Sequence, residues 1–140
     1  MAIEIDHLGI AVRSLAEGLQ FYEKTLGMGV SSRETIAAEQ VTVAMLPAGV
    51  DLNGPRIELL EAIGEASPIA RFIEKRGPGL HHIALRVDDL ARSIERLKSE
   101  GARVLNEPQR GAGGHLYAFL HPASTGGVLL ELIQKEPAKD

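Results

Sequence analysis

The feature of this sequence that most constrains its fold is an internal repeat. The segment I-D-H-L-G-I-A-V at residues 5–12 returns as L-H-H-I-A-L-R-V at residues 80–87. His7 aligns with His82, 75 positions later, and the apolar residues that follow align as well. In each copy a run of strand length precedes a helical pattern. A repeat of this size predicts two similar folding modules in one chain.

Each copy continues with an amphipathic helix that has recognisable start and stop signals. The first is expected from Leu15 to Leu26, after the N-cap residue Ser14. The second is expected to open after Asp89 and to end before Gly101. Apolar residues recur at helical spacing within both segments, so each helix is expected to bury one face.

Strand-like segments follow both helices, and a third helix links the copies. The expected strands are residues 28–36, 41–46 and 56–61 in the first copy, and residues 102–105, 115–120 and 128–133 in the second. Ser67-Pro68 supplies an N-cap and a first-turn proline for a linking helix at about residues 67–76. The order is βαβββ, helix, βαβββ, with repeats at about residues 3–62 and 79–135.

Composition excludes several functional classes. The 140 residues contain no cysteine, which rules out disulfides, zinc–thiolate sites, iron–sulfur clusters and a cysteine nucleophile. A net charge of -4 and 4% aromatic residues argue against a nucleic-acid partner. Neither a membrane-spanning apolar run nor a signal-peptide pattern is found, so we expect a cytoplasmic protein without a membrane partner.

Four polar residues within apolar strand segments form the candidate site. His7 and Glu58 lie in the first copy, 51 residues apart, and His82 and Glu131 lie in the second, 49 residues apart. Ionised carboxylates are costly to bury unless they are paired or bound to a cation. Two nitrogen and two oxygen donors suit a six-coordinate divalent ion with two open positions. The sequence therefore predicts a metal site made of His7, Glu58, His82 and Glu131.

The other histidines are not expected to bind the metal. His81 neighbours His82 but falls on the opposite face of its strand, where a structural hydrogen bond is expected. His115 and His121 have no counterpart in the repeat, so we expect a structural or pocket-lining role for them. The predicted fold class is therefore α+β, with two paired βαβββ modules forming a curved mixed sheet around a central metal site in a single domain, residues 1–140.

Several longer motifs carry a family resemblance over nearly the whole chain. They are R-I-E-L-L-E-A, S-P-I-A-R-F-I, G-L-H-H-I-A-L-R-V-D-D-L, F-L-H-P and G-V-L-L-E-L. The sequence resembles the vicinal oxygen chelate superfamily and, within it, the methylmalonyl-CoA epimerase family. In one branch of that family the second ligand is Gln and a separate Glu stands in the preceding strand. Here those positions are Glu58 and Val43, so the chain follows the other branch.

The resemblance implies the activity, the cofactor and the partners. It implies a divalent metal held by His7, Glu58, His82 and Glu131, with Co²⁺ expected first and Ni²⁺, Mn²⁺, Zn²⁺ or Fe²⁺ as alternatives. It also implies a CoA thioester substrate, methylmalonyl-CoA, and a homodimer. Epimerisation would proceed by α-proton abstraction through a metal-stabilised enolate. We assign the acid and base roles to Glu58 and Glu131, which approach from opposite halves of the repeat.

Three alternative functions are compatible with the same pattern. Glyoxalase I (lactoylglutathione lyase) uses the same kind of site for proton transfer. An extradiol dioxygenase would need two His and one Glu on iron, and Glu58 as a fourth ligand argues against it. A metal-free small-molecule-binding protein of the same fold would not need four ligand-type residues at equivalent positions.

Overall fold

Two units make up the chain in this computed structural model, which describes residues 3–51 and 53–135. The N-terminal module is residues 7–81, and the C-terminal module comprises residues 82–135 together with residues 3–6. The first strand therefore begins in the C-terminal module, and the first strand of the second copy begins in the N-terminal module. A loop is expected at residues 47–55, between the expected strands at residues 41–46 and 56–61, and it includes residue 52, which lies outside the described residues.

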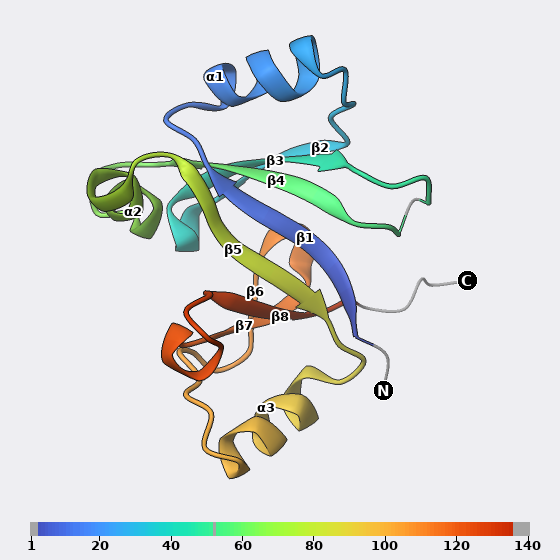
Figure 1. Cartoon of the computed structure of the whole chain (residues 1–140), viewed down its shortest axis with the longest axis vertical. Helices are drawn as coiled ribbons and strands as arrows, with labels where there is room; N and C mark the ends of the chain where they lie inside the picture. The colour runs from blue at the N-terminus through green and yellow to red at the C-terminus, as the bar shows by residue number, and fades with distance from the viewer. Residues whose placement is uncertain (1–2, 52, 136–140) are drawn as a thin grey trace. The chain divides into compact units, whose positions relative to one another are not determined.

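The element order repeats between the modules (Figure 1). The first copy contains β1 (Glu4–Ala11), α1 (Leu15–Leu19), η1 (Gln20–Thr25), β2 (Ser32–Ile36), η2 (Ala37–Glu39), β3 (Val41–Pro47), β4 (Arg56–Ala62) and the linking helix α2 (Pro68–Arg76). The second contains β5 (Gly79–Arg86), α3 (Leu90–Ser99), β6 (Gln109–Arg110), η3 (Ala112–Gly114), β7 (Leu116–Leu120), η4 (Pro122–Ser124) and β8 (Leu130–Gln134). The predicted βαβββ order is confirmed in both copies.

Strand pairing also repeats. In the N-terminal module the order is β2-β3-β4-β1, with β1 parallel to β4 and the other neighbours antiparallel. In the C-terminal module the order is β5-β8-β7-β6, with β5 parallel to β8 and the others antiparallel. A parallel pair needs a long crossover, and the intervening helix and strands provide it in each module.

Both faces of the N-terminal strands are covered by helices. Helix α1 packs Leu15 and Leu19 against Leu59 and its neighbours on one face. Helix α2 packs Ile69 against Val43 and other residues on the opposite face. Ser67 accepts a hydrogen bond from the Ile69 amide at 3.2 Å, so the predicted cap and proline start of α2 are confirmed.

The first predicted helix is wound differently from expectation. Only Leu15–Leu19 is α-helical, and Gln20–Thr25 forms a π-helical segment in which the Leu26 amide bonds the Phe21 carbonyl at 2.8 Å. The wider π turn rotates later residues away from the α-helical stripe. Leu26, expected on the buried face, is consequently 58% exposed.

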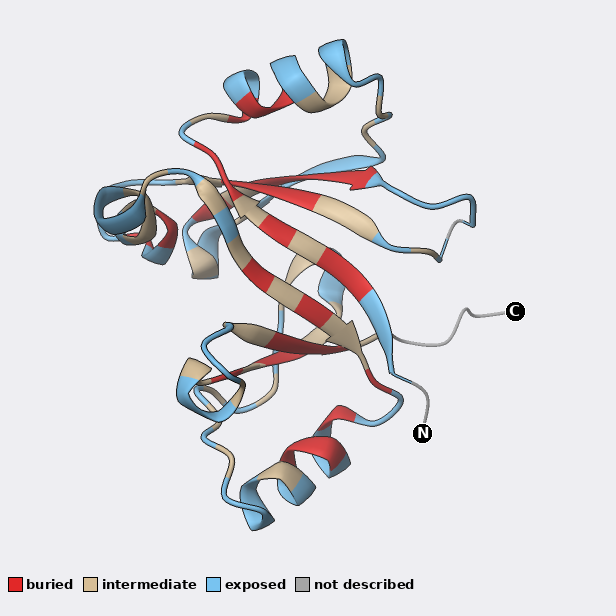
Figure 2. Ribbon diagram, viewed as in Figure 1, coloured by how far each residue is buried: buried red, intermediate tan, exposed pale blue. Residues whose placement is uncertain are grey.

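The C-terminal module has one helix against its strands. Leu90 and Ile94 of α3 pack on Leu132 and Ala118, and Figure 2 shows the buried side of α3 turned towards the strands. The expected strand at residues 102–105 is wrong, because only Val104 makes a bridge, to Leu120. The Asn106 side-chain oxygen accepts a hydrogen bond from the Phe119 amide at 2.8 Å. This side-chain bond replaces a backbone bond that a neighbouring strand would make.

The part of the chain covered by residues 3–51 and 53–135 contains no helix long and apolar enough to cross a membrane.

Candidate metal and catalytic site

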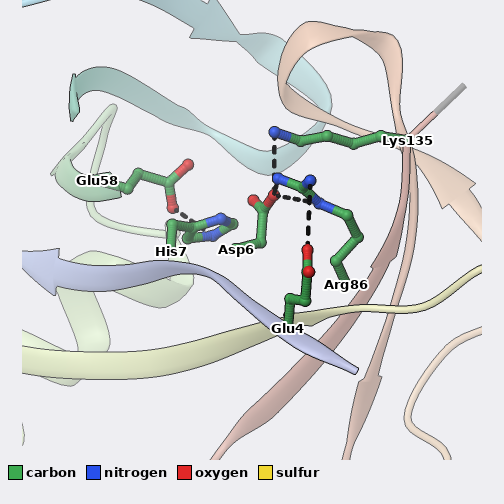
Figure 3. Close-up of polar contacts among 6 residues, drawn as sticks. All are labelled: Glu4, Asp6, His7, Glu58, Arg86 and Lys135. Atoms are coloured by element: carbon green, nitrogen blue, oxygen red, sulfur yellow. Dashed lines mark hydrogen bonds and ion pairs between the residues drawn. The ribbon is translucent and has the colours of Figure 1, made fainter. Parts of the chain in front are cut away.

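The N-terminal module brings together the two polar residues predicted for its half of the site. His7 lies on β1 and Glu58 on β4, and the His7 Nε2 atom is 3.5 Å from Glu58 Oε1 (Figure 3). Their side chains are only 3% and 6% exposed. A carboxylate so deeply buried requires a partner, and His7 is placed to provide one or to share a cation with it.

The C-terminal module repeats this arrangement. His82 on β5 and Glu131 on β8 place Nε2 and Oε1 3.1 Å apart, with both side chains largely buried. The ring of Phe119 stands edge-on to the His82 ring at 5.5 Å between centroids. Phe119 is also the cross-strand partner of Glu131, so one aromatic side chain packs beside both members of this pair.

Strand register explains why the two pairs match. Glu58 is paired with Gly9, two residues after His7, across the parallel β1–β4 ladder. Glu131 is paired with Ala84, two residues after His82, across the parallel β5–β8 ladder. Because residues two apart on a strand share a face, each Glu lies diagonally beside its His. The repeat therefore reproduces the geometry of the pair as well as its residues.

The donor atoms in each module suit a divalent ion. Imidazole nitrogen and carboxylate oxygen bind first-row metals at about 2.0–2.2 Å, so two neighbouring ligands on one ion lie about 3 Å apart. The observed separations of 3.5 and 3.1 Å are close to that value. Without a metal ion, an ion pair between a protonated His and an ionised Glu would also explain each contact.

Three other residues singled out in the sequence have identifiable surroundings. Val43, at the position of the additional Glu in one branch of the family, is buried among apolar residues under α2 and offers no acid or base. His81 packs edge-on against Phe72 of α2, with ring centroids 5.0 Å apart. His121 caps the turn after it, since its Nδ1 accepts the Ala123 amide at 2.9 Å.

Sequence reasoning missed one charged group near these strands. Asp6, next to His7, is 0% exposed and contacts Arg86 and Lys135. The available signal was the one used for Glu58, namely an ionisable residue inside an apolar strand.

Comparison with known proteins identifies the family. The model of the glyoxalase/bleomycin resistance protein/dioxygenase superfamily matches residues 6–119. The chain belongs to this superfamily. An ethylmalonyl-CoA/methylmalonyl-CoA epimerase of Cereibacter sphaeroides is 41% identical over 133 residues, which cover 93% of this chain and 96% of that protein.

Solved structures of this superfamily agree with that placement. Methylmalonyl-CoA epimerase from Mycobacterium tuberculosis has a TM-score of 0.89 and 36% identity, covering 96% of this chain and 89% of its own. A methylmalonyl-CoA epimerase in complex with methylmalonyl-CoA and NH4+ has a TM-score of 0.91 and 34% identity, covering 99% of both chains. The predicted vicinal oxygen chelate fold and the resemblance to epimerases are confirmed.

Proposed function

We propose that this chain is a metal-dependent epimerase that interconverts (2R)- and (2S)-methylmalonyl-CoA. The observation that carries the proposal is the buried His–Glu pair that occurs in both modules at the same strand register. Similarity to methylmalonyl-CoA epimerases supports the choice of substrate within the superfamily.

The four side chains would hold one divalent ion, with His7 and Glu58 from one module and His82 and Glu131 from the other. When bound, such an ion supplies positive charge where the enolate oxygen develops, which favours loss of the α-proton. Cobalt is our first choice of ion. All four donors are nitrogen or oxygen, in keeping with the absence of cysteine.

The two carboxylates would also carry the proton transfers. One carboxylate oxygen accepts the α-proton on one face of the substrate, and the protonated carboxyl group of the other Glu returns a proton to the opposite face. Glu58 and Glu131 are repeat-related, so they are suited to act from opposite sides. After each turnover one carboxyl group has gained a proton and the other has lost one, and exchange with solvent resets the pair.

The test is NMR of methylmalonyl-CoA in D2O with the purified protein, after chelation and with Co²⁺ restored. We expect rapid loss of the α-proton signal that depends on the metal, with no other change in the substrate. No exchange above the blank, with the metal confirmed bound, would contradict the proposal. Turnover of the glutathione hemithioacetal in a parallel assay would instead favour glyoxalase I.

The oligomeric state of the protein and its location in the cell are part of the same proposal. We expect residues 1–140 to act as a single domain, the protein to be a homodimer and the site of action to be the cytoplasm. Analytical ultracentrifugation would check the dimer, with a monomer at micromolar concentration as the contradicting result.

A further inference from the structure

A charged cluster of Asp6, Arg86 and Lys135, with Glu4 nearby, lies in the C-terminal module (Figure 3). Arg86 donates to Asp6 Oδ1 from Nη2 at 2.8 Å and from Nε at 3.2 Å. Lys135 Nζ lies 3.0 Å from the same oxygen. The Asp6 side chain is 0% exposed, whereas those of Arg86 and Lys135 are each 20% exposed. The carboxylate is therefore enclosed while both cationic side chains reach solvent.

The cluster lies at a fixed spacing from the proposed metal ligands. Arg86 follows His82 by four residues on β5, and Lys135 follows Glu131 by four residues, just past the end of β8. Four residues of strand span about 13 Å, and an even spacing keeps side chains on the same face. Both cations thus lie along the face that carries the His82–Glu131 pair.

The other module has no charge at the matching positions. The equivalents of Arg86 and Lys135 are Ala11 and Ala62, which pack with Ile69 and other residues of the cluster under α2. The two His–Glu pairs are repeated but the two cations are not. A role in binding the shared ion would predict repetition, so the cations point to a part of the ligand that is not symmetric.

Both cationic groups are ordered by the same enclosed carboxylate. Asp6 contacts Arg86 and Lys135, and it holds both in place before any ligand arrives. Glu4 approaches Arg86 only to 3.9 Å, and its side chain is 67% exposed, so this contact is weak and screened. Phosphate oxygens accept hydrogen bonds from guanidinium and ammonium groups, and such charge-assisted bonds are stronger than neutral ones.

We propose that Arg86 and Lys135, positioned by Asp6, bind the phosphate groups of the CoA portion of the substrate. The proposal rests on the proposed function, because it takes a CoA thioester as the ligand. The pantetheine arm separates the thioester from the phosphates, and the spacing along β5 and β8 provides for that separation.

The first experiment compares methylmalonyl-CoA with a shorter thioester that lacks the adenosine and all phosphate groups of CoA. Steady-state kinetics would be measured with methylmalonyl-CoA and with the methylmalonyl thioester of pantetheine, which carries no phosphate. In Arg86→Gln and Lys135→Gln we expect KM for the CoA thioester to rise roughly tenfold each, because each loses a charge-assisted hydrogen bond. KM for the pantetheine thioester should stay at its wild-type value. Equal changes for both substrates would overturn the proposal.

Three further variants sharpen this result. Lys98→Gln removes a lysine that pairs with Glu107 on the surface, and it should change neither KM. Glu4→Gln removes an exposed carboxylate whose contact with Arg86 is weak, so KM for the CoA thioester should fall only slightly. Asp6→Asn should raise that KM alone, as expected of a positioning residue, whereas a drop in thermal stability with both KM values unchanged would show a structural role only.

Binding of free CoA separates this proposal from the proposed function. Calorimetry with CoA alone needs no turnover, and we expect wild type to bind it more tightly than Arg86→Gln or Lys135→Gln. If wild type binds CoA in this way but exchanges no α-proton, the phosphate site stands and the epimerase proposal fails. If exchange is normal and CoA binds all variants equally, the phosphate site is wrong.

Discussion

The two modules are alike where they hold their His–Glu pairs and differ in what surrounds those pairs. Both place the Glu diagonally beside its His across a parallel ladder. The N-terminal module covers the adjoining surface with α2 and with Ala11 and Ala62, whereas the C-terminal module carries Arg86 and Lys135 there. Duplication thus preserved a symmetric donor set and allowed the rest of each face to diverge. Under the proposed function this division suits a single substrate, whose reacting carbon would bind at the repeated donors while its remaining groups are asymmetric.

The same contrast occurs beside the carboxylates themselves. The cross-strand partner of Glu131 is Phe119, and the corresponding partner of Glu58 is Met45. A rigid ring that also contacts His82 restricts one carboxylate more than a flexible thioether restricts the other. The two Glu residues therefore have similar positions and different surroundings, and this difference leads to the first prediction.

The largest expected effect comes from neutralising either carboxylate. Glu58→Gln and Glu131→Gln keep an oxygen donor but remove the group that accepts or returns a proton. Each should slow α-proton exchange by about 10²–10⁴-fold. Exchange of the α-deuteron measured separately from each substrate epimer would show which Glu serves which face. Full activity in either variant, with metal content unchanged, would end the assigned role for that residue.

A smaller effect is expected where the helices of the two modules approach their strands. Gly18 in α1 corresponds to Ser93 in α3, but a Cβ on Gly18 would lie 3.0 Å from Val12 Cγ1 and 3.1 Å from Leu59 Cδ1. Ser93 fits its site and donates from Oγ to the Asp89 carbonyl at 2.8 Å. Gly18→Ser should therefore lower the free energy of unfolding by about 1–3 kcal/mol through overpacking.

The reverse substitution provides the matched comparison. Ser93→Gly should cost about 1 kcal/mol, because glycine is a poorer helix former. Urea unfolding of both variants would measure the difference. If Gly18→Ser is as stable as wild type, α1 has room for a side chain above its strands, as α3 has, and the proposed difference in packing is wrong.

These comparisons also show which features could be read from the sequence. The modules, the start of each helix and the two His–Glu pairs were predictable, because the repeat presents each signal twice. The π-helical segment was not, since the apolar spacing from Leu15 to Leu26 also fits an α-helix. The segment at residues 102–105 has strand-like residues, but the side chain of Asn106 takes a bond that a strand would supply.

The charged cluster of Asp6, Arg86 and Lys135 could not be predicted from the sequence, for a different reason. Asp6, Arg86 and Lys135 come from three separate strands or strand ends, and their sequence separations match no repeat and no motif. Only the folded chain brings them together. The His and Glu of each pair are also far apart in the sequence, but the same residues recur at a similar spacing in both copies, so the repeat made them recognisable.

The smallest effect concerns the first turn of each helix, where the modules use different side chains for the same bond. The Leu15 amide donates to Glu61 Oε1 at 2.6 Å, and the Leu90 amide donates to Gln134 Oε1 at 2.7 Å. Glu61 and Gln134 occupy equivalent positions after the proposed ligands, and only Glu61 is charged. A negative charge at a helix N-terminus adds about 0.3–1 kcal/mol.

Exchanging the two residues tests whether charge or hydrogen bonding matters there. Glu61→Gln should lower stability by a few tenths of a kcal/mol, and Gln134→Glu should raise it by a similar amount. Alanine at either position should cost about 1 kcal/mol, because the amide loses its side-chain acceptor. Chemical denaturation at low and high salt would separate the contributions, since only the charge effect is screened. If Glu61→Ala costs no more than Glu61→Gln, the hydrogen bond from the Leu15 amide contributes nothing beyond the charge.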